Sequence, residues 1–364
     1  MANELATGWV QAFIERRSPT MFLSSMFTTK PGGIYYGKTV EIDVKRFSEN
    51  VAVVITKLSG PNFNDASLIS TKEFEPPEYG EAFATDVDDL LQRLIGVNPY
   101  DDANIAYSSK LVGRLMDYFM EANDMIMRGV EIQASQILQT GRLNLLDRDG
   151  ETAYEIDYAP KATHFPTVTT AWSDDGADPI DDLRALFEVI RADGKVNPDM
   201  IIMGEQALRW ALRNANFQEE LDNRRIDTGM IDPRMMASGA TLYGNVWVGS
   251  YMAQIWTYPE GYSHPQTRAF TKYVNDDSVI VLSSQTRLDR VSAIVPLPLG
   301  PDQRVSQMLP DLVPGRMVSE GDDLDVTPNL YPTPNGRTII AELLSRILLV
   351  PVQIDGFGCL DVNP

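Results

Sequence analysis

Few side chains in this sequence could carry out catalysis, and none has a recognisable catalytic spacing. The chain of 364 residues contains two histidines, His164 and His264, and one cysteine, Cys359. A histidine acts as a general base only when a partner side chain orients it and a nucleophile lies within reach. The two histidines lie near prolines, with no serine or cysteine motif beside them. We therefore expect structural or surface roles for both, and no catalytic residue.

The usual motifs of cofactor and enzyme sites are also missing from the sequence. There is no GxGxxG or Walker A loop, no HExxH and no GxSxG. The single Cys359 excludes an intrachain disulfide and a multi-thiolate metal site, and burial as a small apolar side chain is its commonest role. The sequence thus predicts no cofactor and no enzyme activity.

Acidic clusters are the remaining candidates for binding a divalent cation. They are Asp86, Asp88 and Asp89; Asp174, Asp175 and Asp178; and Glu320, Asp322 and Asp323. Helix caps and solvated turns are more common roles for such clusters. The stretch LDRDGE, residues 146–151, resembles a calcium loop, but its glycine comes too early and no acid occupies the closing position. We expect no metal site.

Composition places the chain among folded proteins. Hydrophobic residues make up 43% and aromatic residues 9%, enough for one large or two ordinary domains. With 51 acidic and 31 basic residues, the net charge of −20 repels nucleic-acid phosphates and disfavours sequence-specific DNA binding. No apolar run approaches about 18 residues, and MANELATGWVQAF lacks a basic leader followed by an apolar core. We expect an intracellular product without a membrane span or signal peptide.

The longest predicted element, on which the other elements are expected to pack, is a helix over 98–141. Asn98 can cap it, Pro99 suits its first position, and Gly141 can close it. At 1.5 Å per residue it spans about 60 Å, which suits an extended body, although a long core helix of an ordinary enzyme is the alternative. Apolar residues recur along one face at steps of three, four or seven, opposite a charged face: Ile105, Val112, Leu115, Phe119, Ala122, Ile126, Val130, Ala134 and Ile137.

Before this helix the sequence predicts an arm. A short amphipathic helix over 4–17 leads into 18–37, an apolar segment with little periodicity. Four of its side chains have no periodic partner nearby, so we expect them to pack across to a neighbouring subunit: Phe22, Leu23, Met26 and Phe27.

A long two-stranded loop follows the arm. A strand over 39–47 precedes it, and the loop itself is predicted over 53–79, with a second strand over 51–58, a turn over 59–65 and a return towards the helix. An isolated hairpin is only marginally stable in water, so we expect this loop to lie on a neighbouring subunit. The contact residues expected from the loop are Asn62, Phe63, Phe74 and Tyr79. Lys57 and Lys72 are candidate crosslinking residues, although solvated charge is the commoner role.

The second half of the chain predicts alternating helices and strands, an α+β class. Asp178 and Pro179 begin a helix ending at Gly194, whose buried side contains Leu183, Leu186, Phe187 and Ile190. A helix over 204–221 is expected to bury Leu208, Leu212 and Ala215. Residues 296–334 are too rich in proline for a helix or central strand and predict an extended connector. Further strands are predicted over 154–160, 163–172, 200–203, 247–258, 278–284 and 338–358.

Several stretches, in the same order, resemble the capsid protein E (lambda major head protein) family of tailed-phage major capsid proteins. They are MFLSSMFTT in the arm, EFEPPEYGEAF at the loop's return, ADPIDDLRA, FQEELDNRR, SVIVLSSQTRL, and LLVPVQIDGFGCLDV near the end. The resemblance covers nearly the whole chain. It implies the Hong Kong 97 type (HK97-like) major capsid fold.

The family's layout implies a division of this chain into named parts. It gives an N-arm at 1–40, an E-loop with flanking strands at 41–97, and a P-domain with the spine helix at 98–175. It also gives an A-domain at 176–284, a P-domain return and connector at 285–337, and a final A-domain strand at 338–364.

The resemblance further implies a structural head protein that assembles as hexamers and pentamers in the host cytoplasm into an icosahedral virion shell. Its implied partners are other copies of itself, a scaffolding protein, a portal at one vertex, a decoration protein in some members, and packaged double-stranded DNA held without sequence-specific binding; no membrane is involved. An encapsulin-like nanocompartment shell and, less favoured, a soluble α/β enzyme are the alternatives.

Overall fold

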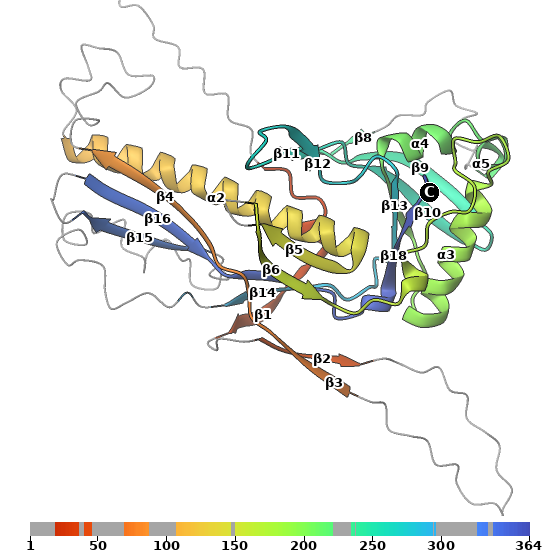
Figure 1. Cartoon of the computed structure of the whole chain (residues 1–364), viewed down its shortest axis with the longest axis horizontal. Helices are drawn as coiled ribbons and strands as arrows, with labels where there is room; N and C mark the ends of the chain where they lie inside the picture. Colours follow the sequence, from red (N-terminus) through yellow and green to blue (C-terminus); the bar gives the residue numbers. More distant parts are fainter. Residues whose placement is uncertain are drawn as a thin grey trace, which may run out of the picture.

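A long helix runs through the molecule and joins a mixed sheet with three helices at one end to smaller sheets at the other (Figure 1). The computed structural model describes residues 19–35, 40–45, 69–86, 107–146, 150–220, 234–236, 238–293, 295, 326–333 and 338–364. None of the helices in these ranges is long and apolar enough to cross a membrane.

The spine helix is α2, Tyr107–Thr140. It ends as predicted at Gly141, whose positive φ of 65° is costly for other residues and whose N–H donates to the carbonyl of Ile137 at 2.8 Å. The predicted stripe is buried at every position whose side chain is described: Leu115, Phe119, Ala122, Ile126, Val130, Ala134 and Ile137. The predicted start, 98–106, lies outside the described residues.

The two halves of α2 are buried differently. Leu115, Phe119, Ala122 and Ile126 form a small core with the strand β16, Thr338–Ser345. Further along, polar residues are buried together with the stripe: Glu131, Gln133 and Ser135. The second half of the helix is therefore covered on more sides than its amphipathic pattern predicts.

The largest sheet has six strands. Their order is β18 (Phe357–Asp361), β13 (Ser278–Leu282), β7 (Met200–Met203), β10 (Tyr251–Thr257), β9 (Thr241–Val248) and β8 (Arg234–Met235). Side chains alternate between the two faces of a strand, and here both faces are apolar. One face packs on α3 (Pro179–Gly194), α4 (Glu205–Ala211) and α5 (Ala215–Glu220); on the other face, Ile202 and Ile280 share a core with α2. We call this sheet with its three helices the large-sheet unit.

Within this unit α3 confirms the sequence analysis. The Asp178 side chain accepts hydrogen bonds from the N–H groups of Ile180 and Asp181 at 3.1 and 3.3 Å, and the predicted apolar side is buried.

Three other predictions in this half were wrong. The helix over 204–221 is broken between α4 and α5, where the Asn214 side chain accepts from the N–H groups of Asn216 and Phe217 and caps α5. This break buries Phe217 and exposes Ala215. The strand over 247–258 is a hairpin that turns at Gly249 (φ 61°). Residues 163–172 hold no strand, only a bridge from Thr167 to Asp361.

Smaller sheets surround the spine. Two have three strands: β15 (Thr327–Pro332), β16 and β4 (Tyr79–Asp86); and β1 (Thr28–Tyr35), β14 (Asp289–Ala293) and β17 (Ile347–Val350). The others are the hairpins β5 (Arg142–Leu146) with β6 (Thr152–Asp157) and β11 (Gly261–Ser263) with β12 (Phe270–Lys272). Of 338–364, only β18 joins the large sheet, because β16 and β17 pair with strands beside the spine. Their placement differs from the single final A-domain strand that the resemblance implied.

A two-stranded ribbon leaves the body near β1 (Figure 1). Its strands are β2 (Val40–Lys45) and β3 (Ile69–Phe74), paired antiparallel from Val40 opposite Phe74 to Lys45 opposite Ile69. This confirms the strand predicted near 39–47 and the returning segment of the loop. The predicted strand over 51–58 and turn over 59–65 lie outside the described residues.

Candidate functional site

His164, one of the two histidines, joins three parts of the fold. It is fully buried, with Nδ1 2.9 Å from the carbonyl oxygen of Phe357 and Nε2 3.3 Å from Oδ2 of Asp193. The Lys161 ammonium lies 2.6 Å from the other Asp193 oxygen, and this hydrogen bond, with that of His164, lowers the pKa of Asp193. The histidine thereby connects the segment before α3 to the end of α3 and to β18, a structural role.

The other candidates for chemistry are also occupied by structural contacts. In the β11–β12 turn the His264 Nδ1 accepts from the N–H of Gln266 at 3.3 Å. Cys359 is buried in β18, and burial raises the pKa of its thiol to about 12, so the nucleophilic thiolate does not form near neutral pH. Asp178 caps α3.

Among the residues that the structure describes, no three metal-ligating side chains come together. Asp88, Asp89, the cluster at 320–323 and residues 147–149 of the calcium-like stretch lie outside the described residues, as does Lys57.

The arm residues predicted to contact a neighbour are packed inside their own chain. Phe22, Leu23 and Phe27 are buried in the core shared by α2 and the large sheet, and Met26 packs against that core. The prediction rested on the absence of a partner within the chain, and the fold supplies one. These side chains therefore stabilise the subunit itself, and their contact with another copy stays a prediction.

Glu131 on α2 holds the arm in place. Its carboxylate accepts hydrogen bonds from the backbone N–H groups of Phe22, Leu23 and Ser24 at 3.0, 2.8 and 3.0 Å, and from the Ser24 hydroxyl at 2.5 Å. A buried carboxylate is costly unless its oxygens are satisfied, and these four donors satisfy them.

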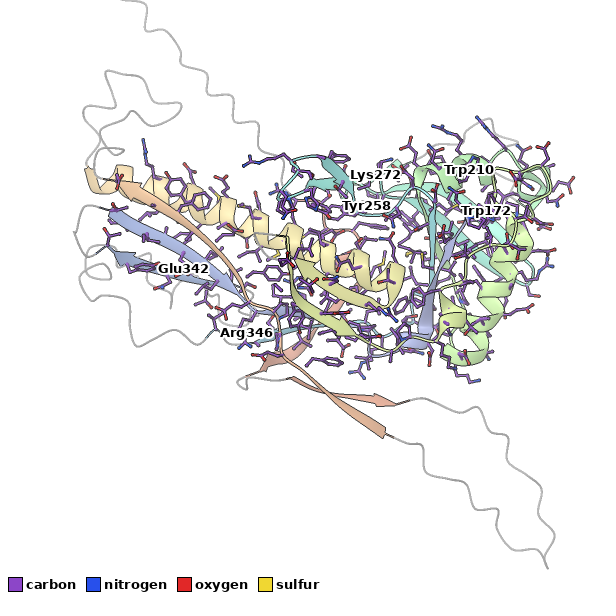
Figure 2. The ribbon with its side chains drawn as sticks, in the orientation of Figure 1. Trp172, Trp210, Tyr258, Lys272, Glu342 and Arg346 are labelled. Carbon is purple, nitrogen blue, oxygen red and sulfur yellow. The ribbon has the colours of Figure 1, made fainter. Side chains whose placement is uncertain are left out.

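An aromatic cluster also packs against the arm. The Phe22 ring lies 5.5 Å from Trp256 and 5.4 Å from Tyr258, and Tyr258 stacks on Tyr273. The Tyr258 hydroxyl also donates to the carbonyl of Thr20 at 2.9 Å. Burial and the neighbouring carboxylate of Glu131 raise the pKa of Tyr258, so this donor stays protonated. Tyr258 lies between the spine and the large-sheet unit (Figure 2).

The base of the ribbon is a second place, after the arm, where distant segments of the chain are joined. Phe74, at the end of β3, packs on the ring of Tyr158 at 5.3 Å, and the Tyr154 hydroxyl donates to the carbonyl of Glu75. An Arg346 guanidinium nitrogen lies 4.0 Å from the Glu75 carboxylate, close to where β3 leaves the body (Figure 2). Pro76 and Pro77, which follow, are buried. Proline fixes φ, so the backbone is restricted where the ribbon joins β4.

Tyr79 begins β4 and ties the return of the loop to the spine. Gln133 Nε2 donates to its hydroxyl oxygen at 2.7 Å, and burial raises the pKa of Tyr79. Its ring lies against Gly129, where an added Cβ would come within 3.0 Å. Phe74 and Tyr79, both predicted to contact a neighbour, thus anchor the ribbon within the subunit. Asn62 and Phe63 lie outside the described residues.

The sequence analysis missed the polar residues at these junctions, chiefly Glu131 and Gln133. Glu131 follows Asp124 by seven residues, on the helix face that the pattern assigns to solvent. A glutamate on a polar helix face gives no sign that a segment over 100 residues away covers it.

Comparison with known proteins assigns the chain to a family. A family model described as phage major capsid protein E matches residues 11–355. No curated protein gives a significant match.

Similar solved structures include the putative capsid protein of a prophage of E. coli CFT073, with 12% identity over 95% of this chain and 93% of that chain and a TM-score of 0.59. Mycobacterium phage Che8 matches with 11% identity over 100% and 98% and a TM-score of 0.47. An encapsulin complex from Synechococcus elongatus PCC 7942 matches with 11% identity over 97% and 92% and a TM-score of 0.41.

The likeness to the prophage protein shows a common fold, the HK97-like α+β fold that the sequence resemblance implied. The family match extends over nearly all of the chain. The chain therefore belongs to the phage major capsid protein E family and is a structural protein of the phage head.

Proposed function

We propose that this chain assembles as hexamers and pentamers into an icosahedral shell around double-stranded DNA, and that it catalyses no reaction. The observation that carries the proposal is the β2–β3 ribbon. Two strands alone are marginally stable in water, and within the described residues these strands pair only with each other. A ribbon of this kind gains stability when it lies on another copy of the chain.

The candidate bases and the thiol support the absence of catalysis. His164 and Cys359 are buried in structural contacts, and His264 accepts its hydrogen bond from backbone within a turn. The net charge of −20 agrees with a container whose wall should not hold packed phosphates tightly.

Assembly in the host cytoplasm requires further partners. We propose a scaffolding protein during assembly, a portal at one vertex and, as in some relatives, a decoration protein. The DNA is enclosed without sequence-specific contacts.

Deletion of residues 60–67 tests the ribbon's role. The deleted chain should keep the circular dichroism spectrum and melting temperature of the unassembled subunit, yet form no particles by sedimentation and electron microscopy. Glu219→Gln, an exposed position on α5 of the large-sheet unit, is the control and should assemble normally. Assembly of the deleted chain at the rate of the full chain would refute the proposal.

The content of purified particles tests the alternative. Particles formed with the other phage head proteins should contain double-stranded DNA. Particles that enclose an enzyme and no DNA would instead identify a nanocompartment shell.

A further inference from the structure

The carboxylate of Glu131 lies at the start of a helical turn in the arm. The 3-10 turn η1, Ser24–Met26, has Leu23 as its N-cap, and the Leu23 side chain provides no capping hydrogen bond. The first N–H groups of a helical turn need acceptors, which a nearby serine, threonine or aspartate usually supplies. Here the acceptor comes from α2, 107 to 109 residues further along the chain. Glu131 is thus a long-range cap of the arm.

The capped arm bridges two parts of the subunit. Towards the spine it is held by Glu131, and towards the large-sheet unit Phe22 packs on Trp256 while Thr20 bonds to Tyr258. Downstream, the N–H of Thr28 donates to the carbonyl of Leu288 at 2.9 Å, where β1 begins to pair with β14. The segment 20–27 therefore crosses the junction between α2 and β10.

In the described part of the chain, Phe22, Leu23 and Phe27 belong to the core between α2 and the large sheet, whereas two other cores do not include the arm. The core between the large sheet and α3–α5 contains no arm residue, and neither does the small core between α2 and β16. The spine also has its own bonds to the large-sheet unit, since Gln139 Nε2 donates to the carbonyl of Tyr273 and its Oε1 accepts from the N–H of Asn275. None of these contacts involves an arm residue.

We infer that Glu131 is a latch and that residues 20–27 form a strap, which docks across the junction through this carboxylate and is released separately from unfolding of the subunit. Four hydrogen bonds from three consecutive residues converge on one side chain, so its loss affects the whole segment at once. Release of the strap exposes Trp256 and Tyr258 and removes one of the links between spine and large-sheet unit. The latch acts within one chain and does not depend on assembly.

Hydrogen exchange of the full-length chain tests the latch. In Glu131→Ala the amides of 20–27 should exchange at least about tenfold faster than in the wild type, because each hydrogen bond to a charged group contributes about that factor. Amides of α3 and β13 should keep their rates. The matched control is Glu121→Gln, an exposed glutamate on the same helix, which should change neither set.

Acetate added to Glu131→Ala provides a second readout. A small carboxylate that enters the vacated space should restore slow exchange at Phe22, Leu23 and Ser24, whereas chloride at the same ionic strength should not. Wild-type exchange rates at these amides in Glu131→Ala would overturn the inference.

If Glu131→Ala fails to fold, Glu131→Gln carries the test. It keeps the shape of the side chain but places an amide N–H₂ among donors. Faster exchange confined to 20–27 supports the latch. Faster exchange in α3 and β13 by the same factor would show that the strap cannot detach on its own and would overturn it.

Discussion

The large-sheet unit and the β2–β3 ribbon show two ways in which strands are stabilised in one chain. In the large-sheet unit, α3–α5 cover one face, the spine covers part of the other, and Val279, Ile280 and Val281 of β13 are fully buried. The ribbon has two strands that pair only with each other among the described residues, and it is held at its base by Phe74 and Glu75. The unit is packed within its own chain, whereas we propose that the ribbon gains its stability from a neighbouring copy.

The spine helix α2 is intermediate between the unit and the ribbon in how far its own chain covers it. Its second half is buried on the faces that carry Val130, Glu131 and Gln133, while its first half is covered on the stripe side and leaves Met116 and Met120 exposed. The arm supplies part of the cover of the second half.

The largest effect is expected from Phe187→Ala in the large-sheet unit. This ring is fully buried and packs on Tyr251 at 5.8 Å, so the cavity should lower the free energy of unfolding by about 3–5 kcal/mol. Denaturant titration of the unassembled subunit measures it. The neighbouring exposed Glu188→Gln should stay within about 0.5 kcal/mol. A loss below about 1 kcal/mol for Phe187→Ala would mean that this core is not the stable part.

Phe119→Ala applies the same test to the first half of the spine. Phe119 is buried between α2 and β16, and its truncation should also cost about 3–5 kcal/mol. A much smaller loss in the same titration would show that the sheet β15–β16–β4 covers the spine only loosely in the free subunit.

Leu23→Ala separates the arm from the ribbon. Because Leu23 is fully buried in its own chain, the substitution should destabilise the unassembled subunit by about 2–5 kcal/mol. Thr29→Ala, an exposed position a few residues later, is the control and should have little effect on the melting curve. An unchanged subunit with weakened particles would restore the expectation that the arm packs on a neighbour.

Alanine substitutions at two glycines of α2 compare the exposed and the covered parts of the spine. An added Cβ at Gly113 meets nothing within 4 Å, so Gly113→Ala should raise stability by about 1 kcal/mol through helix propensity. At Gly129 the same methyl group lies 3.0 Å from the Tyr79 ring, so Gly129→Ala should gain less or lose stability. Equal gains in thermal unfolding would show that Tyr79 does not pack on the helix as described.

The smallest effect is expected at Asp193. Its pKa is lowered in the fold by Lys161 and then His164, so its contribution is present above the unfolded pKa of about 4 and is lost as the pH falls through the folded value. Asp193→Asn should therefore be less stable than the wild type at pH 7, by up to about 1 kcal/mol since the carboxylate is partly exposed. The difference should shrink as the pH falls below about 4. A difference that persists unchanged at pH 3 would contradict this origin.

Local patterns predicted much of the fold. The stripe on α2, the closing Gly141 and the Asp178 cap of α3 are each encoded within a few residues, so the sequence alone located them. The break between α4 and α5 depends on one side chain, Asn214, that bonds to backbone two and three residues on. These side-chain hydrogen bonds compete with the backbone bonds of a continuous helix, and the pattern of apolar residues does not reveal them.

Contacts between distant segments were beyond the sequence. Strand β18 pairs with β13, and β16 pairs with β4. These strands are far apart in the sequence, and hydrophobic periodicity carries no information about which distant strands pair. The arm's apolar residues were identified, but their partner Trp256 and the buried Glu131 depend on the tertiary fold. The buried contacts of the arm were therefore assigned to a neighbour when they lie within the subunit.

The most direct test of the account is hydrogen exchange of the same chain as free subunits and as assembled shells. On assembly the amides of 40–45 and 69–74, which form the ribbon, should gain protection by a factor of about ten or more, while those of β13 and α3 should be equally protected in both states. Ribbon amides that are as protected in the free subunit as in the shell would contradict the claim that the ribbon is completed by a neighbouring copy.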